Sequence, residues 1–475
     1  MKITLKNFGP IAHFEFDVDK DMHVIFGKNN IGKSYAITAV YLILKNFLEY
    51  LPNIFNAQKH KYNVTYTKAH GEIPLSVTEN GGKEINVTNR IEEILLAYFE
   101  TKLIGIENSF KNSFPPIVSL PNSKAKEILK IEIKFHDFNI VIKNNESKLF
   151  LESVTLSQKV LAAKSPEVIS PEVNKENTFF IFTKEGSLSD LQSSIDHLLH
   201  NSRKELLTKI SSVHFLPASR SGLYQALGSL SSIIVELSKS RNFLRNKLEI
   251  PSLTETVSDY FLSLGNIDVS TNLTFKDAIS VLENEILKGT VSFNNETKRI
   301  MFKANGMNDD LELTFVSSMV SEIAPIVAYL KFIVSKEAKD WDIFLWNIDK
   351  TESIANCSLL FIEEPEAHLH PEVQVKLMEL FALLAGNRVK IVMTSHSNYM
   401  FNKLSNLLLE GKVNAERVAS YLMRATDVGS VTDMLAMKAE ADGMNDDNFA
   451  DTSEMLYEER IKIYDQLNNE AGNAA

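Results

Sequence analysis

Apolar and polar residues alternate near the start of the chain, with Ile3 and Leu5 set against Lys2 and Lys6. This period of two predicts short strands of a meander. The apolar run MHVIF that follows is typical of a buried strand, and YAITAVYLILKNFLEYL places apolar residues at helical spacing. The pattern therefore predicts a strand, a glycine-containing loop and a helix, in that order.

The loop between this strand and this helix reads GKNNIGKS and matches the pattern G-x-x-x-x-G-K-[ST]. Its glycines let the backbone approach a phosphate, and its amides then point at that phosphate beside the positive end of the helix. In such a loop Lys33 reaches the β- and γ-phosphates, and the Ser34 hydroxyl holds Mg²⁺. We expect ATP and Mg²⁺ as ligands, with the nucleotide bound by Gly27, Lys28, Asn29, Asn30, Ile31, Gly32, Lys33 and Ser34.

A second apolar run, SLLFIEE, predicts another buried strand, and this strand ends in two carboxylates. We expect Glu363 to lie at the magnesium ion and Glu364 to orient or deprotonate the attacking water. The run VKIVMTSHS predicts a further strand with His396 just past its end, where the strand ends of a parallel sheet gather. A neutral imidazole there can bond a γ-phosphate or the attacking water. The predicted catalytic residues are therefore Glu364 and His396.

The segment FIEEPEAHLHP concentrates glutamates and histidines, and this density raises the alternative of a metal hydrolase. His368 and His370 are two residues apart in a loop after a proline, whereas zinc proteases place two histidines four residues apart on a helix. The magnesium-and-water interpretation is therefore favoured over a zinc site.

The composition is ordinary for a globular protein, with 44% hydrophobic and 23% charged residues. A chain of 475 residues is too long for one simple hydrophobic core, so we expect two or three lobes.

The net charge of −11 argues against a surface that binds nucleic acid non-specifically, but it does not exclude a local basic groove. The single cysteine, Cys357, excludes an intrachain disulfide and a cysteine-rich zinc site. Because no signal peptide or membrane-spanning run is apparent, we expect a cytoplasmic protein without a membrane partner.

Two long regions separate the motifs. Within residues 46–211, ILKIEIKFHDFNIVIKNNESKLFLESVTL predicts a strand meander with a turn near Asn144–Glu146, and SLSDLQSSIDHLLHNSRKELLTKI predicts a helix. After Leu223, a helical run precedes the hairpin pattern TVSFNNETKRIMFKAN. No heptad repeat is long enough for an extended coiled coil. A basic cluster is interpreted as a solvated helix face rather than a nucleic-acid contact; its members are Lys239, Arg241, Arg245 and Lys247.

GKNNIGKS, LLFIEEPEAHLHP and VMTSHS, in that order, resemble the ABC-type ATPases of the OLD, SMC-like and prokaryotic defence group, whose members are commonly described as AAA-type. Three further stretches, FLPASRSGL, FVSSMVSEIAPIVAYLKF and GMNDDNFADTSEMLYEERIKIYDQL, resemble its arginine segment, its signature segment and its C-terminal end. The resemblance covers little of the interior from about Asn46 to Ser211.

The resemblance implies two ATPase heads that sandwich ATP head to tail. Each nucleotide then contacts the phosphate loop, carboxylates and histidine of one subunit and the signature serines, Ser317 and Ser318, of the other. The resemblance also places the loop from Glu366 to His370 near the subunit interface, so that its histidines have interface or structural roles.

The sequence departs from the pattern of this group in three respects. Met319 stands where the signature usually has glycine, which loosens the approach of the backbone to the phosphate. Glu363 stands where many ABC proteins have aspartate, which changes the reach but not the charge. OLD nucleases carry a Toprim domain after the ATPase, whereas only about eighty residues follow His396. Nuclease chemistry is therefore expected in a separate partner.

The predicted fold is α/β: an ABC-type (P-loop) ATPase head with a mixed central sheet, an N-terminal β-meander lobe and a helical insertion. We expect an N-terminal ATPase lobe with the phosphate loop at 1–45 and a β-meander completion with an insertion at 46–211. An ATPase segment with a helical and hairpin insertion follows at 212–315. The lobe with the signature, the carboxylates and the histidine spans 316–465, and a disordered tail spans 466–475.

The leading hypothesis is an ATP-hydrolysing switch that forms a homodimer or higher homo-oligomer on ATP. It would control a separate effector, a nuclease, in anti-phage defence; PARIS-type and Septu-type ATPases are examples, and this assignment rests on analogy. The alternative is an SMC-like DNA-binding or repair ATPase clamp with DNA as its partner, which predicts a salt-dependent DNA affinity that rises with ATP. The net negative charge of the chain and the lack of a long coiled coil argue against this alternative.

Overall fold

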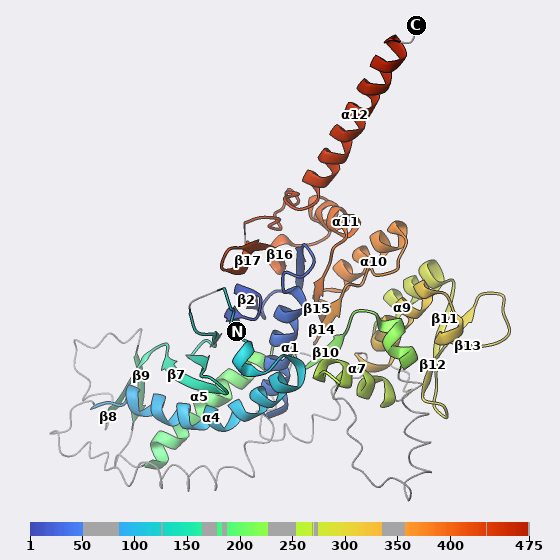
Figure 1. Ribbon diagram of the computed structural model, residues 1–475. Coiled ribbons are helices and arrows are strands. Elements are labelled where there is room, and N and C mark those ends of the chain that lie inside the picture. Colours follow the sequence, from blue (N-terminus) through green and yellow to red (C-terminus); the bar gives the residue numbers. More distant parts are fainter. Residues whose placement is uncertain are drawn as a thin grey trace, which may run out of the picture.

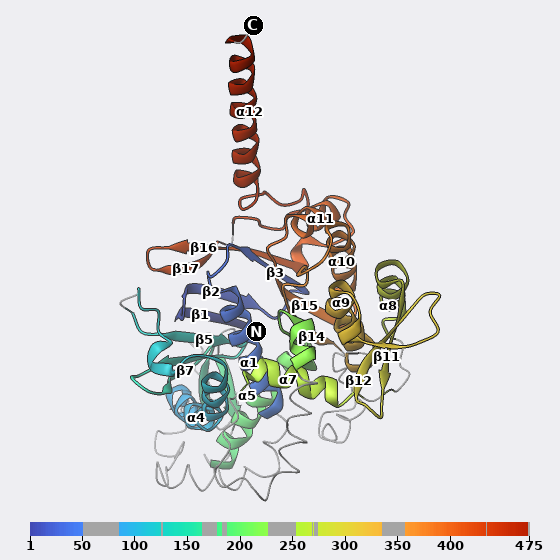
Figure 2. The ribbon, with the colours of Figure 1, turned by 45° about the vertical axis from the view of Figure 1, so that its right-hand side comes forward.

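The computed structural model describes residues 1–50, 85–124, 127–163, 178–182, 188–226, 253–267, 269, 274–334, 357–433 and 435–473. In these ranges, strands and helices pack into a body from which one long helix, α12 (Ala450–Asn473), projects (Figure 1; Figure 2). Apolar side chains of α12 such as Tyr457 and Tyr464 are exposed. No described helix combines the length and the hydropathy needed to cross a membrane.

The body is built on one large mixed sheet. Its strands lie in the order β10 (Ser212–Leu216), β14 (Ser358–Glu363), β15 (Val389–Thr394), β3 (Met22–Gly27), β16 (Val418–Thr426), β17 (Gly429–Asp433), β2 (Ile11–Asp17), β1 (Lys2–Phe8), β5 (Lys130–Lys134), β6 (Phe138–Asn144) and β7 (Leu149–Leu156). Neighbours from β10 to β16 are parallel, and those from β2 to β7 are antiparallel. The predicted α/β class with a mixed central sheet is therefore confirmed.

Two apolar cores lie on opposite faces of this sheet, because successive residues of one strand enter different cores. Ile25 belongs to the first core, and its neighbours Val24 and Phe26 belong to the second. Burial on both faces explains why the strands read as continuous apolar runs rather than alternating ones. The first core is covered by α1 (Lys33–Tyr50), α4 (Thr88–Ser113) and α5 (Leu188–Leu207). The second is covered by α7 (Glu255–Gly265), α8 (Lys276–Ser280), α9 (Ser318–Ala328), α10 (Pro371–Leu384) and α11 (Asn398–Leu409).

Smaller elements complete the body. One small sheet contains β11 (Gly289–Asn294), β12 (Arg299–Ala304) and β13 (Leu311–Glu312), and a second contains β4 (Ile85–Asn86), β8 (Lys159–Ala163) and β9 (Thr178–Phe182). The hairpin predicted after Leu223 is the antiparallel pair β11–β12. Short helical turns are η1 (Ile117–Ser119), η5 (Val281–Leu287), η6 (Leu313–Phe315), η7 (Tyr329–Ile333) and η9 (Ala415–Arg417).

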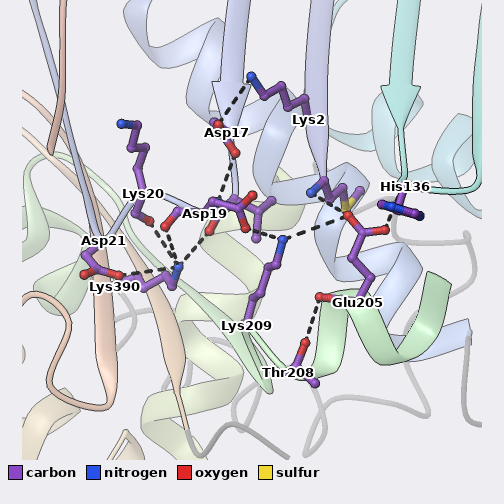
Figure 3. Close-up of polar contacts among 12 residues, drawn as sticks. Lys2, Asp17, Asp19, Lys20, Asp21, His136, Glu205, Thr208, Lys209 and Lys390 are labelled. Atoms are coloured by element: carbon purple, nitrogen blue, oxygen red, sulfur yellow. Dashed lines mark hydrogen bonds and ion pairs between the residues drawn. The ribbon is translucent and has the colours of Figure 1, made fainter. Parts of the chain in front are cut away.

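Polar contacts fix the amino ends of the parallel strands (Figure 3). Lys390 of β15 donates to the carbonyl oxygens of Val18, Asp19 and Lys20, at 2.8, 3.3 and 3.3 Å, in the turn before β3. The terminal ammonium of Met1 lies 2.8 Å from the Glu205 carboxylate of α5. These contacts tie β15 to the turn before β3, and the start of the chain before β1 to α5, at the edge opposite the loops that follow β3 and β15.

The predicted meander and helix within residues 46–211 are confirmed as β5–β6–β7 and α5. Helix α4 in the same region was not anticipated, although its buried residues recur at helical spacing, for example Ile91, Leu95 and Tyr98. Helix α12 continues to Asn473, through most of the segment 466–475 for which a disordered tail was expected. The basic cluster at 239–247 lies outside the described residues.

Candidate functional site

Three loops meet at one edge of the central sheet because they follow strands that run parallel there. β3 ends at Gly27, β14 at Glu363 and β15 at Thr394, and β15 lies between the other two strands. The loop after β3 enters α1 at Lys33, so its amides lie beside the amino end of that helix. The carboxyl edge of parallel strands is where open α/β sheets place their ligands.

The loop after β3 needs glycine at two positions for steric reasons. Gly27 has a φ of +141°, and a Cβ there would lie 2.7 Å from the carbonyl oxygen of Met423. Gly32 has a φ of +94°, and its Cβ would lie 2.6 Å from Cγ of Pro10. Any other residue at these positions would push the loop out of shape. The two glycines of the sequence motif are therefore required by the backbone itself.

Lys33 is a buried cation at the centre of the site, with 6% of its surface exposed. Its ammonium donates to the carbonyl oxygens of Gly27 and Lys28, at 3.0 and 2.9 Å, and lies 2.7 Å from Nε2 of His396. Burial lowers the pKa of Lys33 to about 8, although the negative charges of Glu364 and Glu366 oppose that shift. The ammonium is therefore charged at neutral pH but loses its proton more easily than an exposed lysine.

The two carboxylates at the end of β14 have different surroundings. Burial raises the pKa of Glu363, and the neighbouring Ser34 hydroxyl and the backbone amide of Ala218 oppose that shift. The Ala218 amide donates to the Glu363 carboxylate at 3.1 Å. Ser34 and Glu363, the two predicted magnesium ligands, are thus neighbours. Glu364 is half-exposed and has a φ of +41°, a left-handed conformation that is rare for glutamate. Its amide donates to the carbonyl oxygen of Thr394 at 3.2 Å.

His396 lies between Lys33 and Glu364, and its Nε2 is 3.8 Å from the Glu364 carboxylate. Burial and the charge of Lys33 lower the pKa of His396, so the imidazole is neutral at neutral pH. The Glu366 carboxylate accepts from the His396 amide at 2.5 Å and from the Ser395 hydroxyl at 2.9 Å. The sequence reasoning assigned Glu366 only to a loop after the strand, because its partners lie on a different strand end.

Lys33, Glu364 and His396 line one cleft with a volume of about 780 Å³, whereas Glu363 and Glu366 are not among its walls. The residues that form its walls are Pro10, Asn29, Asn30, Ile31, Gly32, Lys33, Ser34, Tyr35, Glu364 and His396. The cleft therefore brings together predicted residues from the phosphate loop, from the end of β14 and from the end of β15.

Other predicted residues lie elsewhere. Ser317 and Ser318 are exposed at the amino end of α9, and neither belongs to the cleft walls. The Ser317 hydroxyl caps this helix by accepting from the amide of Val320 at 3.5 Å. His370 caps α10, its Nδ1 accepting from the Glu372 amide at 3.3 Å. Within the described ranges, no three histidine, cysteine, aspartate or glutamate residues are placed to hold a metal ion together.

The donor set matches what a magnesium–triphosphate ligand needs. The glycine loop offers amides at a helix amino end, and Lys33 offers a buried positive charge. Ser34 and Glu363 offer adjacent oxygen atoms, which are the donors that Mg²⁺ prefers.

The lowered pKa of Lys33 predicts that affinity for ATP depends on pH. The triphosphate prefers the charged ammonium, so binding raises the Lys33 pKa, and linkage gives full affinity below about pH 8. Above that pH, affinity should fall by up to about tenfold per unit, because the free protein must first regain a proton. Equilibrium titrations with ATP between about pH 7 and about pH 9.5 check this, since the last phosphate proton is lost at about pH 6. An affinity that is flat across this range would contradict the interpretation.

Comparisons with known proteins bear on the whole chain. Residues 1–401 match the family model described as AAA ATPase domain. No curated protein matches the sequence. The SMC head domain from Thermotoga maritima is similar with a TM-score of 0.33 and 11% identity, covering 91% of this chain and 97% of that one. An Smc head domain derived from Pyrococcus furiosus, with an extended coiled coil and bound to the C-terminal domain of ScpA, gives a TM-score of 0.35 and 12% identity, covering 97% and 98%.

Proposed function

We propose, from the premise that the chain belongs to the AAA ATPase domain family, that it binds ATP with Mg²⁺ in the cleft at Lys33 and hydrolyses it to ADP and phosphate. The observation that carries this proposal is the meeting of Lys33, Glu364 and His396 from three separate segments. Lys33 Nζ lies 2.7 Å from His396 Nε2, which lies 3.8 Å from the Glu364 carboxylate. A buried cation, a neutral imidazole and a carboxylate at one cleft suit a γ-phosphate and its attacking water.

Each residue has a distinct role in this proposal. The loop amides and Lys33 bind and orient the β- and γ-phosphates. Ser34 and Glu363 would hold Mg²⁺, which supplies neutralising charge at the phosphates when bound. Glu364 orients the attacking water and accepts its proton, and His396 positions the γ-phosphate or that water through a hydrogen bond.

We further propose that the chain pairs head to tail on ATP, so that each nucleotide also contacts Ser317 and Ser318 of a second copy. Both hydroxyls are exposed at the amino end of α9 and lie outside the chain's own cleft. Phe315 beside them is 77% exposed. Hydroxyls at a helix amino end suit a phosphate, and an exposed phenylalanine beside them suits a protein contact.

Mixing two inactive variants tests this arrangement. Lys33→Ala and Ser318→Arg should each be inactive, because every site in either homodimer carries one defect. In a mixed dimer one of the two sites receives an intact Lys33 and an intact Ser318. An equimolar mixture should therefore regain ATPase activity, up to about a quarter of the wild-type rate if the two sites turn over independently. The matched control mixes Lys33→Ala with Glu364→Gln. Because one copy supplies both of these residues to a site, each site of the mixed dimer keeps a defect, and the mixture should stay inactive. Mixed dimers that stay inactive in the first experiment would count against the shared site.

We propose finally that the ATP state controls a separate effector, a nuclease, in cytoplasmic anti-phage defence. The support is the resemblance of GKNNIGKS, LLFIEEPEAHLHP and VMTSHS to ATPases of that group. Co-expression with the neighbouring reading frame should protect cells from phage when the wild-type gene is used but not with Lys33→Ala. Equal plating of phage on both strains would contradict this role.

A further inference from the structure

Arg220 is a fully buried arginine in the segment that follows β10, with 0% of its surface exposed. A guanidinium has five N–H donors in a rigid fork. Four of the donors of Arg220 bond carbonyl oxygens, those of Pro217, Glu322, Glu363 and Glu364, and the guanidinium also forms an ion pair with the Glu322 carboxylate. The side chain is therefore held in one geometry and in turn holds four separate peptide groups.

Two of these contacts reach the end of β14. Nη1 of Arg220 donates to the carbonyl oxygen of Glu363 at 2.8 Å, and Nη2 donates to that of Glu364 at 3.3 Å. These peptides belong to the two glutamates at the end of β14, of which Glu364 lines the cleft. Glu364 has a φ of +41°, a conformation that is unfavourable for glutamate and persists only where neighbours enforce it. Arg220 is one of those neighbours, because it binds the backbone on both sides of the α-carbon of Glu364.

The other contacts reach α9. Nη2 of Arg220 lies 3.2 Å from the Glu322 carboxylate, and both side chains are 0% exposed. Nε donates to the carbonyl oxygen of Glu322 at 3.3 Å. Glu322 also accepts from the Ser221 hydroxyl at 2.6 Å. Glu322 lies one helical turn after Ser318, so the amino end of α9 is tied to the end of β14 through a single guanidinium.

A buried ion pair is weak evidence for stability, because replacing such a pair by well-packed apolar side chains of similar size often leaves the protein as stable or more stable. Arginine adds a fixed geometry between several backbone groups, since its fork is planar and directional. The arrangement thus determines where the two glutamates at the end of β14 lie relative to α9.

We propose that Arg220 and Glu322 are positioning residues that hold Glu363 and Glu364 in the geometry for hydrolysis and make that geometry depend on the position of α9. This inference rests on the proposed ATPase function. Contact between Ser317–Ser318 and the second copy's nucleotide then reaches the chain's own carboxylates through Glu322 and Arg220. Occupancy of one site thereby regulates turnover at the other.

The test separates nucleotide binding from turnover in two conservative variants. Arg220→Lys keeps the charge but has three donors, and Glu322→Gln keeps the shape but loses the charge. Each should lower kcat by about tenfold or more and leave the ATP dissociation constant within about threefold. Because the two residues act as one unit, the double variant should be no slower than the slower single variant. Arg203→Met is the matched control, since Arg203 is a buried arginine on α5. It should leave both kcat and the ATP dissociation constant unchanged.

Single variants that fail to fold are replaced by Arg220→Met/Glu322→Leu, which removes both buried charges at similar volume. This variant should also bind ATP and turn over slowly. Folded variants with the wild-type kcat, or independent effects of the two single changes, would overturn the inference. A wild-type protein that does not hydrolyse ATP would instead overturn the proposed function.

Discussion

Lys33→Ala should raise the dissociation constant for ATP by at least about a hundredfold, a loss of about 3 kcal/mol. Lys33 is the buried cation of the cleft, and its ammonium lies beside the loop amides that face the phosphates in the proposed complex. No other described lysine or arginine belongs to the cleft walls, so the triphosphate has no substitute charge there. Isothermal titration or a fluorescent nucleotide would measure the change.

The matched control for this variant is Lys148→Ala, which removes an exposed lysine from the turn between β6 and β7. Its ATP affinity should equal that of the wild type. Tight ATP binding by folded Lys33→Ala would show that the loop after β3 is not the phosphate site.

Glu364→Gln should keep ATP affinity but slow hydrolysis by about a hundredfold to ten-thousandfold, the usual contribution of a general base. The amide is similar in shape to the carboxylate but cannot accept the proton of the attacking water. Because ATP is bound but not consumed, assembled subunits should accumulate. Phosphate release would measure the turnover, and light scattering with ATP or ADP would measure the assembly.

The control for this second variant is Glu372→Gln on α10, whose side chain is 75% exposed. It should turn over and assemble as the wild type does. Normal turnover by Glu364→Gln would show that another group of the site acts as the base, for example Glu366, whose carboxylate contacts Ser395 and His396.

The parts of the fold that the sequence predicts best are those determined by local pattern. The strand before Gly27 and the helix after Lys33 follow from hydrophobic periodicity, and the glycines of the loop follow from backbone angles that other residues rarely adopt. The same holds for the strands that end at Glu363 and Thr394. Because strands of one parallel sheet share an edge, their end residues were expected to meet, and the structure brings Lys33, Glu364 and His396 together.

Contacts between segments that are distant in the sequence could not be predicted from local sequence patterns. Arg220 was noted only as part of an arginine segment, because nothing near it in the sequence indicates that its acceptors come from β14 and α9. Glu366 does lie in a loop, as predicted, but its contacts were missed for the same reason, since its partners follow β15. Helix α4 was missed for a different reason. Its apolar residues do recur at helical spacing, but the strand-like sequence runs on either side of it led to the prediction of a β-meander for the whole region.

We propose that this chain hydrolyses ATP with the help of Mg²⁺ at the cleft of Lys33, Glu364 and His396. Phosphate release by the purified wild-type chain tests this most directly. We predict a saturable rate that stops when magnesium is chelated, is unaffected by a zinc-selective chelator, and is lost in both Lys33→Ala and Glu364→Gln. Absence of phosphate release by folded wild-type protein at saturating ATP and magnesium, or release that continues unchanged in both variants, would contradict it.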